Sequence, residues 1–298
     1  MCDVSMLKLR YGCTLINLQS SLSSFRETLL IRLANVSGAY DIDGISDVCE
    51  TLDCIANLYR VKGENQKALQ FFQQCLKRRL RLLSITCSDE TIVSLLLQTY
   101  EEVVMLTKLQ AKECENDSEI LNEIGKLLAE MGSLYDRRLN KKSKALIYYQ
   151  KALQLFEQTK DYKQVSNTLL LIGMIHVKKL DNQEAYKCFQ DSLVKRRVYS
   201  KEKDTAEIAE TMHNIGNCEA KDGRFDESLR SFEEALRIKN QICPNEGLSI
   251  AKTEHCMGLV MLQLGNLDAA LGFFEKSLKV RRALLSNDHL DISFSLHR

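Results

Sequence analysis

The chain has 298 residues, of which 45% are hydrophobic and 27% are charged, a composition typical of a soluble globular protein. Lys and Arg total 41 against 40 Asp and Glu, so no general basic field would attract nucleic acid or an anionic membrane. One proline and 13 glycines are too few for a β-rich fold or long flexible linkers, and the composition therefore indicates an all-α protein.

The N-terminal segment, residues 1–45, contains one amphipathic stretch at about 20–35 and a glycine-containing boundary near 38–44. We expect 1–45 to form a helical cap or an irregular segment, and 46–298 to form a helical array. The first twenty residues lack the basic start and apolar run of a signal peptide, and no apolar run of membrane length occurs. The 11 cysteines include no C-x-x-C pair, so we interpret them as small hydrophobic residues and expect a cytoplasmic protein.

Two segments in the first half share a pattern of small and aromatic residues. The repeat at 46–84 has Ala56, Phe72 and Cys75, and the repeat at 118–160 has Gly132 and Tyr149 at the matching positions. Residues 88–115 between them are helical by periodicity but lack the pattern, and we interpret them as a degenerate repeat.

Three later segments, 163–200, 204–243 and 247–285, align without gaps. Their first small residues are Gly173, Gly216 and Gly258, in steps of 43 and 42 residues. A second small residue follows after 12 residues, an aromatic residue after 16, and a third small residue after 19. These are Ala185, Phe189 and Ser192, then Ser228, Phe232 and Ala235, then Ala270, Phe274 and Ser277.

The last residues, 288–298, match the start of another first helix and stop before its small residue. Solenoid ends need a polar cap, so this partial helix is either a cap or the start of a further repeat. We expect the chain to be a fragment of a longer array.

The spacing has a physical reason, because helices that cross at about 8–10 Å need small residues at the crossing. The pattern resembles the tetratricopeptide repeat family, whose usual repeat has about 34 residues. The longer step of this chain is similar to the repeats of kinesin light chains and nephrocystin-like proteins. The resemblance covers about 46–298 and implies a right-handed α-solenoid of stacked antiparallel helix hairpins.

Sequence motifs of catalysis were sought and not found. The chain has no phosphate-binding loop, nucleophile elbow or zinc-hydrolase motif, so we expect no enzyme activity, no cofactor and no metal site. His213 with Cys218, and His255 beside Cys256, are possible metal pairs. Ordinary helix positions are the favoured interpretation, because adjacent residues on a helix point about 100° apart.

Basic clusters recur at 77–79, 195–197 and 279–282, near the ends of second helices. They could form a ridge for phosphate, nucleic acid or acidic lipid, or they could be cations near helix C-termini. Repetition at one position favours the second interpretation, and we expect no nucleic-acid partner and no membrane insertion.

The resemblance implies that first helices line a concave groove, which binds an extended peptide or a partner helix. Counting from the small residue of each first helix predicts which side chains face the groove. The candidates are Asn167, Leu170, Met174, Lys178, His213, Asn214, Asn217, Lys221, Lys252, His255 and Leu259.

Asn214 and Asn217 carry carboxamides, which can both donate to and accept from a peptide backbone. Lysines stand beside apolar residues in the candidate set, so we predict a ligand that alternates acidic and apolar residues. The sequence thus predicts a protein-interaction scaffold or adaptor. The alternatives are a structural module that self-associates through its C-terminal end, and a regulatory domain of a larger protein.

Overall fold

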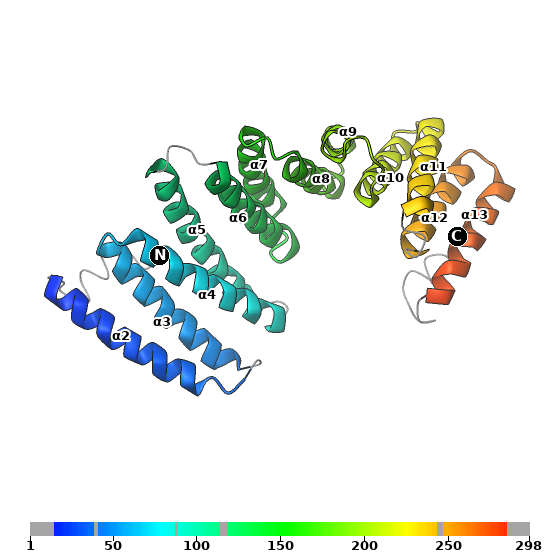
Figure 1. The fold of residues 1–298 in the computed structure, drawn as a ribbon. Coiled ribbons are helices and arrows are strands. Elements are labelled where there is room, and N and C mark those ends of the chain that lie inside the picture. The colour runs from blue at the N-terminus through cyan, green and yellow to red at the C-terminus, as the bar shows by residue number, and fades with distance from the viewer. Residues whose placement is uncertain (1–14, 39–40, 87–88, 114–117, 243–246, 285–298) are drawn as a thin grey trace. The chain divides into compact units, whose positions relative to one another are not determined.

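The structure is a computed structural model that describes residues 15–38, 41–86, 89–113, 118–242 and 247–284 (Figure 1). All regular elements in these ranges are α-helices. They are α2 (Leu15–Asn35), α3 (Ile42–Val61), α4 (Asn65–Thr86), α5 (Glu90–Glu113), α6 (Ser118–Arg137), α7 (Lys142–Gln158), α8 (Tyr162–Lys178), α9 (Asn182–Ser200), α10 (Ala206–Lys221), α11 (Phe225–Ile242), α12 (Gly247–Gln263) and α13 (Leu267–Leu284). The chain divides into an N-terminal unit, Met1–Leu155, and a C-terminal unit, Phe156–Arg298.

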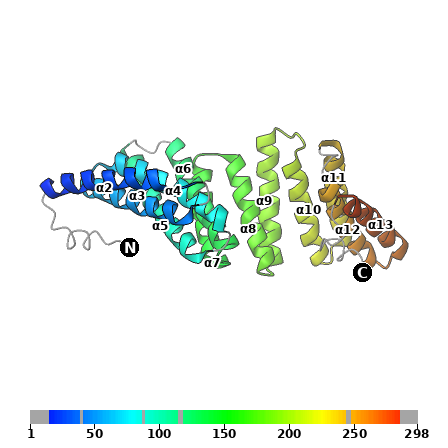
Figure 2. The ribbon, with the colours of Figure 1, turned by 90° about the horizontal axis from the view of Figure 1, so that it is seen from below.

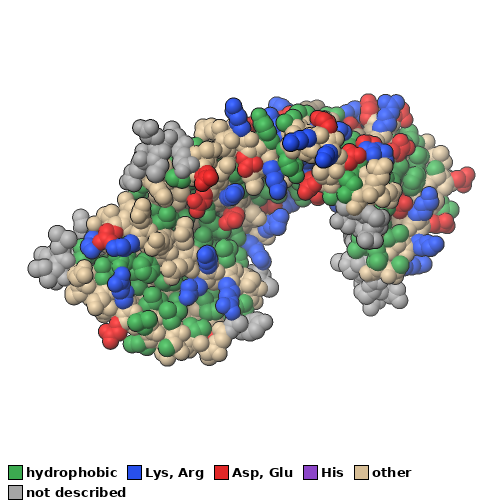
Figure 3. Space-filling view, in the orientation of Figure 1, with side chains coloured by type: hydrophobic (Ala, Val, Ile, Leu, Met, Phe, Trp, Pro, Cys, Tyr) green, Lys and Arg blue, Asp and Glu red, His purple; other side chains and the backbone are tan. Residues whose placement is uncertain are grey.

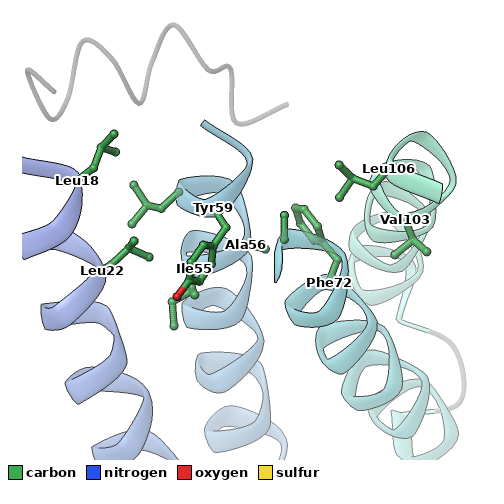
Figure 4. Packing of buried hydrophobic residues seen from close by; sticks show 10 residues of the cluster. Leu18, Leu22, Ile55, Ala56, Tyr59, Phe72, Val103 and Leu106 are labelled. Carbon is green, nitrogen blue, oxygen red and sulfur yellow. The ribbon is translucent and has the colours of Figure 1, made fainter. Parts of the chain in front are cut away.

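In the N-terminal unit, α2, α3, α4 and α5 pack against one another in chain order (Figures 1 and 2). Leu18 and Leu22 of α2 pack on the side of α3 that carries Ile55 and Tyr59 (Figure 4). Phe72 of α4 belongs to the same buried cluster and connects it to α5. The helix over the predicted amphipathic stretch therefore covers an apolar face of α3.

The segment interpreted as a degenerate repeat contains a single helix, α5, over its described part. This helix packs against α4 on one side and α6 on the other. The hairpin signature returns in α6 and α7, where a Cβ atom added to Gly132 would lie 2.9 Å from the ring of Tyr149. The N-terminal unit thus places one unpaired helix between two hairpins.

The C-terminal unit contains three hairpins, α8–α9, α10–α11 and α12–α13, over its described residues. Each crossing places a glycine of the first helix against the phenylalanine of the second. A Cβ atom added to Gly173, Gly216 or Gly258 would lie 2.6, 2.8 or 2.7 Å from that ring. Only a residue without a Cβ atom permits this approach. The predicted fold class, an α-solenoid of stacked antiparallel hairpins, is confirmed.

The turn inside each hairpin needs a left-handed residue, and Gly223 supplies it with φ of +76°. The backbone N–H of Arg224 then donates to the carbonyl of Glu219 at 2.9 Å, which closes the end of α10. Leu180 takes the same position between α8 and α9 with φ of +62°, and its side chain is 88% exposed. The turn geometry is therefore kept even where glycine is replaced.

Candidate peptide-binding surface

A buried cation joins consecutive repeats at one position of the second helix. Lys239 of α11 is 5% exposed, and its Nζ donates to the carbonyl of Ser249 at 3.1 Å and to Oγ1 of Thr253 at 2.8 Å, both on α12. The cation therefore holds the first helix of the next repeat. Buried basic residues occupy the same position in other repeats, namely Arg79, Arg196 and Arg281.

Arg79 of α4 makes the equivalent contact in the N-terminal unit. Its guanidinium donates to the carbonyl of Leu95 at 3.1 Å and to the hydroxyl of Thr99, both on α5, and it pairs with Asp53 of α3. The interpretation of the basic clusters as cations near helix C-termini was incomplete, because one cation of each cluster is buried, and Arg79 contacts the following helix. The sequence analysis did not predict this role. A basic residue recurs in steps of 43 and 42 residues, at Arg196, Lys239 and Arg281, and this repetition could have indicated it.

His213 lies in the interior of the C-terminal unit and is only 2% exposed. Its Nδ1 lies 3.1 Å from Oγ1 of Thr253, and its ring centroid lies 5.4 Å from that of Phe232. Burial, reinforced by Lys239 and Lys252, lowers the pKa of His213 to about 3, so its imidazole is neutral at neutral pH. The prediction that His213 lines an open groove is wrong.

Leu170 is a second correction, because it is 9% exposed and belongs to a buried cluster with Phe189 and Ile215. His255, at the equivalent position, is half-buried with its ring centroid 5.2 Å from that of Phe274. All of these side chains stand three residues before the small residue of their helix. In α8 and α10 this side of the first helix faces the next repeat, so there it is a packing surface.

Asn167 is half-buried, and its Oδ1 accepts a hydrogen bond from Arg196 at 3.2 Å. Arg196 is one of the buried inter-repeat cations, and burial lowers its pKa while Glu207 and Glu210 oppose that shift. The carboxamide of Asn167 is therefore already engaged by the protein itself.

The remaining candidates are exposed or half-exposed on α8, α10 and α12, and we call them the first-helix surface. They are Met174, Lys178, Asn214, Asn217, Lys221, Lys252 and Leu259. Within the described residues, the side chains of Asn214, Asn217, Lys221 and Lys252 make no hydrogen bond or ion pair. These polar groups are available to a ligand without breaking a contact of the fold.

On α10, Asn214, Asn217 and Lys221 follow one another at spacings of three and four residues, so they lie along one face of the helix. Met174, which is 42% exposed, and Leu259 occupy the position of Asn217 in the flanking repeats. Both cationic and anionic side chains appear on the face of the C-terminal unit seen in Figure 3. The surface combines paired donor and acceptor groups, single ammonium groups and small apolar areas.

Metal-binding clusters and membrane-spanning helices are both absent from the part of the chain that the structure describes. No three His, Cys, Asp or Glu side chains in it are grouped to hold a metal ion, including those near His213 and His255. None of its helices is both long and apolar enough to cross a membrane.

Comparison with known proteins gives matches to tetratricopeptide repeat profiles over residues 164–241, over 48–86 and 255–291, and over 125–159. Among solved structures, BtubC (BKLC) from P. vanneervenii is 17% identical with a TM-score of 0.51, over 91% of this chain and 95% of that chain. The apo form of the quorum sensor NprR from B. thuringiensis is 18% identical with a TM-score of 0.50, over 99% of this chain and 72% of that one. At such identities the likeness concerns the fold alone. A search of curated proteins found no match.

Proposed function

The chain belongs to the tetratricopeptide repeat family, and from this premise we propose that it is a scaffold whose first-helix surface binds a peptide segment or a partner helix. The repeats themselves support a role in protein interaction in general. The similarity of the long repeats to those of kinesin light chains stays a prediction. The proposal concerns the first-helix surface of the C-terminal unit.

The observation that carries the proposal is the pair of carboxamides on α10. Asn214 and Asn217 are half-exposed and have no hydrogen-bond partner among the described residues. Each can donate to a peptide carbonyl and accept from a peptide N–H, whatever the side chains of the peptide are. Asn167, in contrast, uses its carboxamide to hold Arg196. Unused carboxamides on a first helix favour backbone recognition.

The neighbouring side chains favour a particular ligand composition. Lys221 and Lys252 carry ammonium groups without a carboxylate partner in the described structure, and Met174 and Leu259 lie at the position of Asn217 in adjacent repeats. A ligand that alternates carboxylates with apolar side chains would pair with the first two and cover the others. The ion pairs would be partly exposed, so each would contribute about 1 kcal/mol or less.

The test compares affinity capture from a cytosolic lysate by the wild-type chain and by the variant Asn214→Ala, Asn217→Ala, Lys221→Glu. A matched control, Gln183→Ala with Lys187→Glu, makes similar changes on the exposed side of α9. Circular dichroism checks that all three have equal helicity. Segments of each captured protein are then made as peptides and their Kd measured. We expect at least about a tenfold weaker Kd for the triple variant only. Equal binding by all three chains would contradict the proposal.

A second candidate function, self-association, is favoured by the exposed face of α13. In the preceding repeat, Phe225 and Leu229 pack against residues of α12. Their equivalents in α13, Leu267 and Leu271, are 65% and 58% exposed. A second copy could cover this face; the predicted partial helix at 288–298 lies outside the described residues. Sedimentation over a range of concentrations tests it, and a constant monomer mass for both wild type and Leu267→Glu, Leu271→Glu would exclude it.

A further inference from the structure

A pocket of about 900 Å³ lies in the N-terminal unit, where α2 faces the turn between α3 and α4. Its lining includes Ser23 and Arg26 of α2, Tyr59 and Lys62 at the end of α3, and Lys67 in the first turn of α4. Tyr59 lies on the side of α3 that packs on α2 (Figure 4). Neither Tyr59 nor Lys62 stands at a repeat position that was predicted to face a groove. The pocket is therefore separate from the first-helix surface, and its volume is in the range of small-ligand sites.

The charge around this pocket is positive. Arg26, Lys62 and Lys67 line it, and no carboxylate belongs to its described lining. Glu64, in the turn beside the pocket, pairs with Lys62 at 2.5 Å and with Lys67 at 2.5 Å. Three cations and one carboxylate leave an excess of two positive charges. Each ammonium group has three N–H donors, so the pairing with Glu64 leaves donors for a ligand.

Arg26 is the cation best placed to meet an anion. Its Nη2 donates to the hydroxyl of Tyr59, and its Cζ lies 5.8 Å from the centroid of that ring. Tyr59 is a firm support, because it is 3% exposed and its ring stacks on that of Phe71 at 5.5 Å. Arg26 itself is exposed and has no carboxylate partner within the described residues. Its guanidinium is thus held in place while most of its five N–H donors stay unused.

The packing of the repeats does not require a cation at the position of Lys67. This position lies in the first turn of a second helix, where the helix macrodipole favours acidic side chains. The three C-terminal repeats have Glu184, Glu227 and Ala269 there, each eleven residues after the small residue of the first helix. The positive charge therefore belongs to the N-terminal unit and not to the repeat as such.

We propose that this pocket binds a phosphate monoester, carried by a phosphorylated side chain of a protein or by a small soluble molecule. The phosphate would accept hydrogen bonds from the guanidinium of Arg26 and from the ammonium groups of Lys62 and Lys67. Arginine matches the geometry of phosphate oxygens with two parallel N–H donors, and such charge-assisted bonds are about twice as strong as neutral ones. A carboxylate carries less charge than a phosphate and should bind more weakly. A basic ligand would be repelled by the excess positive charge.

The experiment follows the backbone amide resonances of the isotope-labelled full chain by NMR during titration. The probes are inorganic phosphate, a short peptide with a central phosphoserine, and the same peptide without the phosphate. Arg26→Gln removes the positive charge while keeping a donor for Tyr59. Ser23→Glu adds a carboxylate to the pocket, and it does not threaten folding because Ser23 is exposed and makes no hydrogen bond within the described residues. Ser24→Glu, the same change one residue further along α2 and outside the lining, is the matched control.

We expect both phosphate probes to shift the resonances of α2 and of the α3–α4 turn, and the unphosphorylated peptide to leave them unchanged. Arg26→Gln and Ser23→Glu should each weaken the Kd by at least about tenfold, and Ser24→Glu by less than about twofold. If Arg26→Gln loses helicity, Ser23→Glu decides. The absence of binding by both phosphate probes, or equal losses in Ser23→Glu and Ser24→Glu, would overturn the proposal.

The two phosphate probes also distinguish the two sources of the ligand. A phosphopeptide that binds more tightly than inorganic phosphate would support a phosphorylated protein segment as the ligand. The reverse order would support a small soluble phosphate compound in the same pocket.

The variant Asn214→Ala, Asn217→Ala, Lys221→Glu separates this pocket from the proposed function. It should bind both phosphate probes like wild type, because its changes lie in the other unit. Loss of the phosphate probes in that variant, with retention in Ser23→Glu, would place the site on the C-terminal unit and refute the pocket as the binding site.

Discussion

One repeat position is occupied differently in the two units, by Asp53 in the N-terminal unit and by His213 in the C-terminal unit. Both stand three residues before the small residue of a first helix, and each has a second-helix phenylalanine nearby. The imidazole ring of His213 packs at 5.4 Å from Phe232 and fills its site. The carboxylate of Asp53 instead pairs with the buried Arg79 of α4.

The difference shows how a repeat protein can vary its surface without changing its fold. The buried cation is kept in both units, as Arg79 and as Lys239, and in both it bonds the next first helix. The side chain beside the cation differs, because Asp53 forms an ion pair with Arg79 whereas His213 is a neutral imidazole. Four changes test this comparison, in order of decreasing expected effect.

Gly216→Val should destabilise the C-terminal unit most. The added Cβ would lie 2.8 Å from the ring of Phe232, which is fully buried, so the packing around it would have to shift. We expect a loss of about 3 kcal/mol, measured by urea unfolding with circular dichroism. Gly272→Ala is the control, since nothing lies within 4 Å of its Cβ, and it should stabilise by up to about 1 kcal/mol. Equal unfolding midpoints for the two variants would contradict the tight crossing. Ala56, the N-terminal equivalent, already carries a Cβ.

Arg79→Met should destabilise the N-terminal unit by about 3 kcal/mol, because it leaves the Asp53 carboxylate without its partner. The double variant Asp53→Asn, Arg79→Met removes that charge and should recover part of the loss. Hydrogen exchange of α3 and α5 measures both effects. A double variant less stable than Arg79→Met alone would show that the ion pair is not the reason.

His213 should make the stability of the C-terminal unit depend on pH. Its pKa of about 3 in the folded state lies below its ordinary value of 6.5, so the unfolded chain takes up the proton first as pH falls. The stabilisation is complete above pH 6.5 and decreases by about 1.4 kcal/mol per pH unit as pH falls towards 3. Urea unfolding at pH 7, 6 and 5 should give this slope in wild type relative to His213→Asn. If the free energy of unfolding depended on pH equally in both chains, the low pKa of His213 would be refuted.

The smallest changes in stability are expected for the three asparagines, and they distinguish Asn167, which packs in the fold, from Asn214 and Asn217 on the surface. Asn167→Ala removes the acceptor of the buried Arg196 and should cost about 1 kcal/mol. Asn214→Ala with Asn217→Ala removes no contact within the described structure and should change stability by less than about 0.5 kcal/mol. Thermal unfolding of the two variants is the measurement. A larger loss for the second variant would mean that these carboxamides stabilise the fold.

The sequence predicted the hairpins because their determinants are local. Small residues such as Gly173 and aromatic residues such as Phe189 recur at fixed offsets, and helix geometry permits few ways to bring them together. The prediction of the groove candidates assumed that each first helix has only one buried side. That assumption failed for Leu170 and His213, because a first helix packs on its own second helix and also on the next repeat.

By itself, then, the sequence determined the helical class, the repeat step and the crossing residues, since these depend on contacts within one hairpin. Only the tertiary structure decided which polar groups are buried in contacts between helices. Lys239 is buried by α12, His213 meets Thr253 40 residues away, and Asp53 meets Arg79 26 residues away. The desolvation and pairing of each group depend on neighbours that no local pattern specifies.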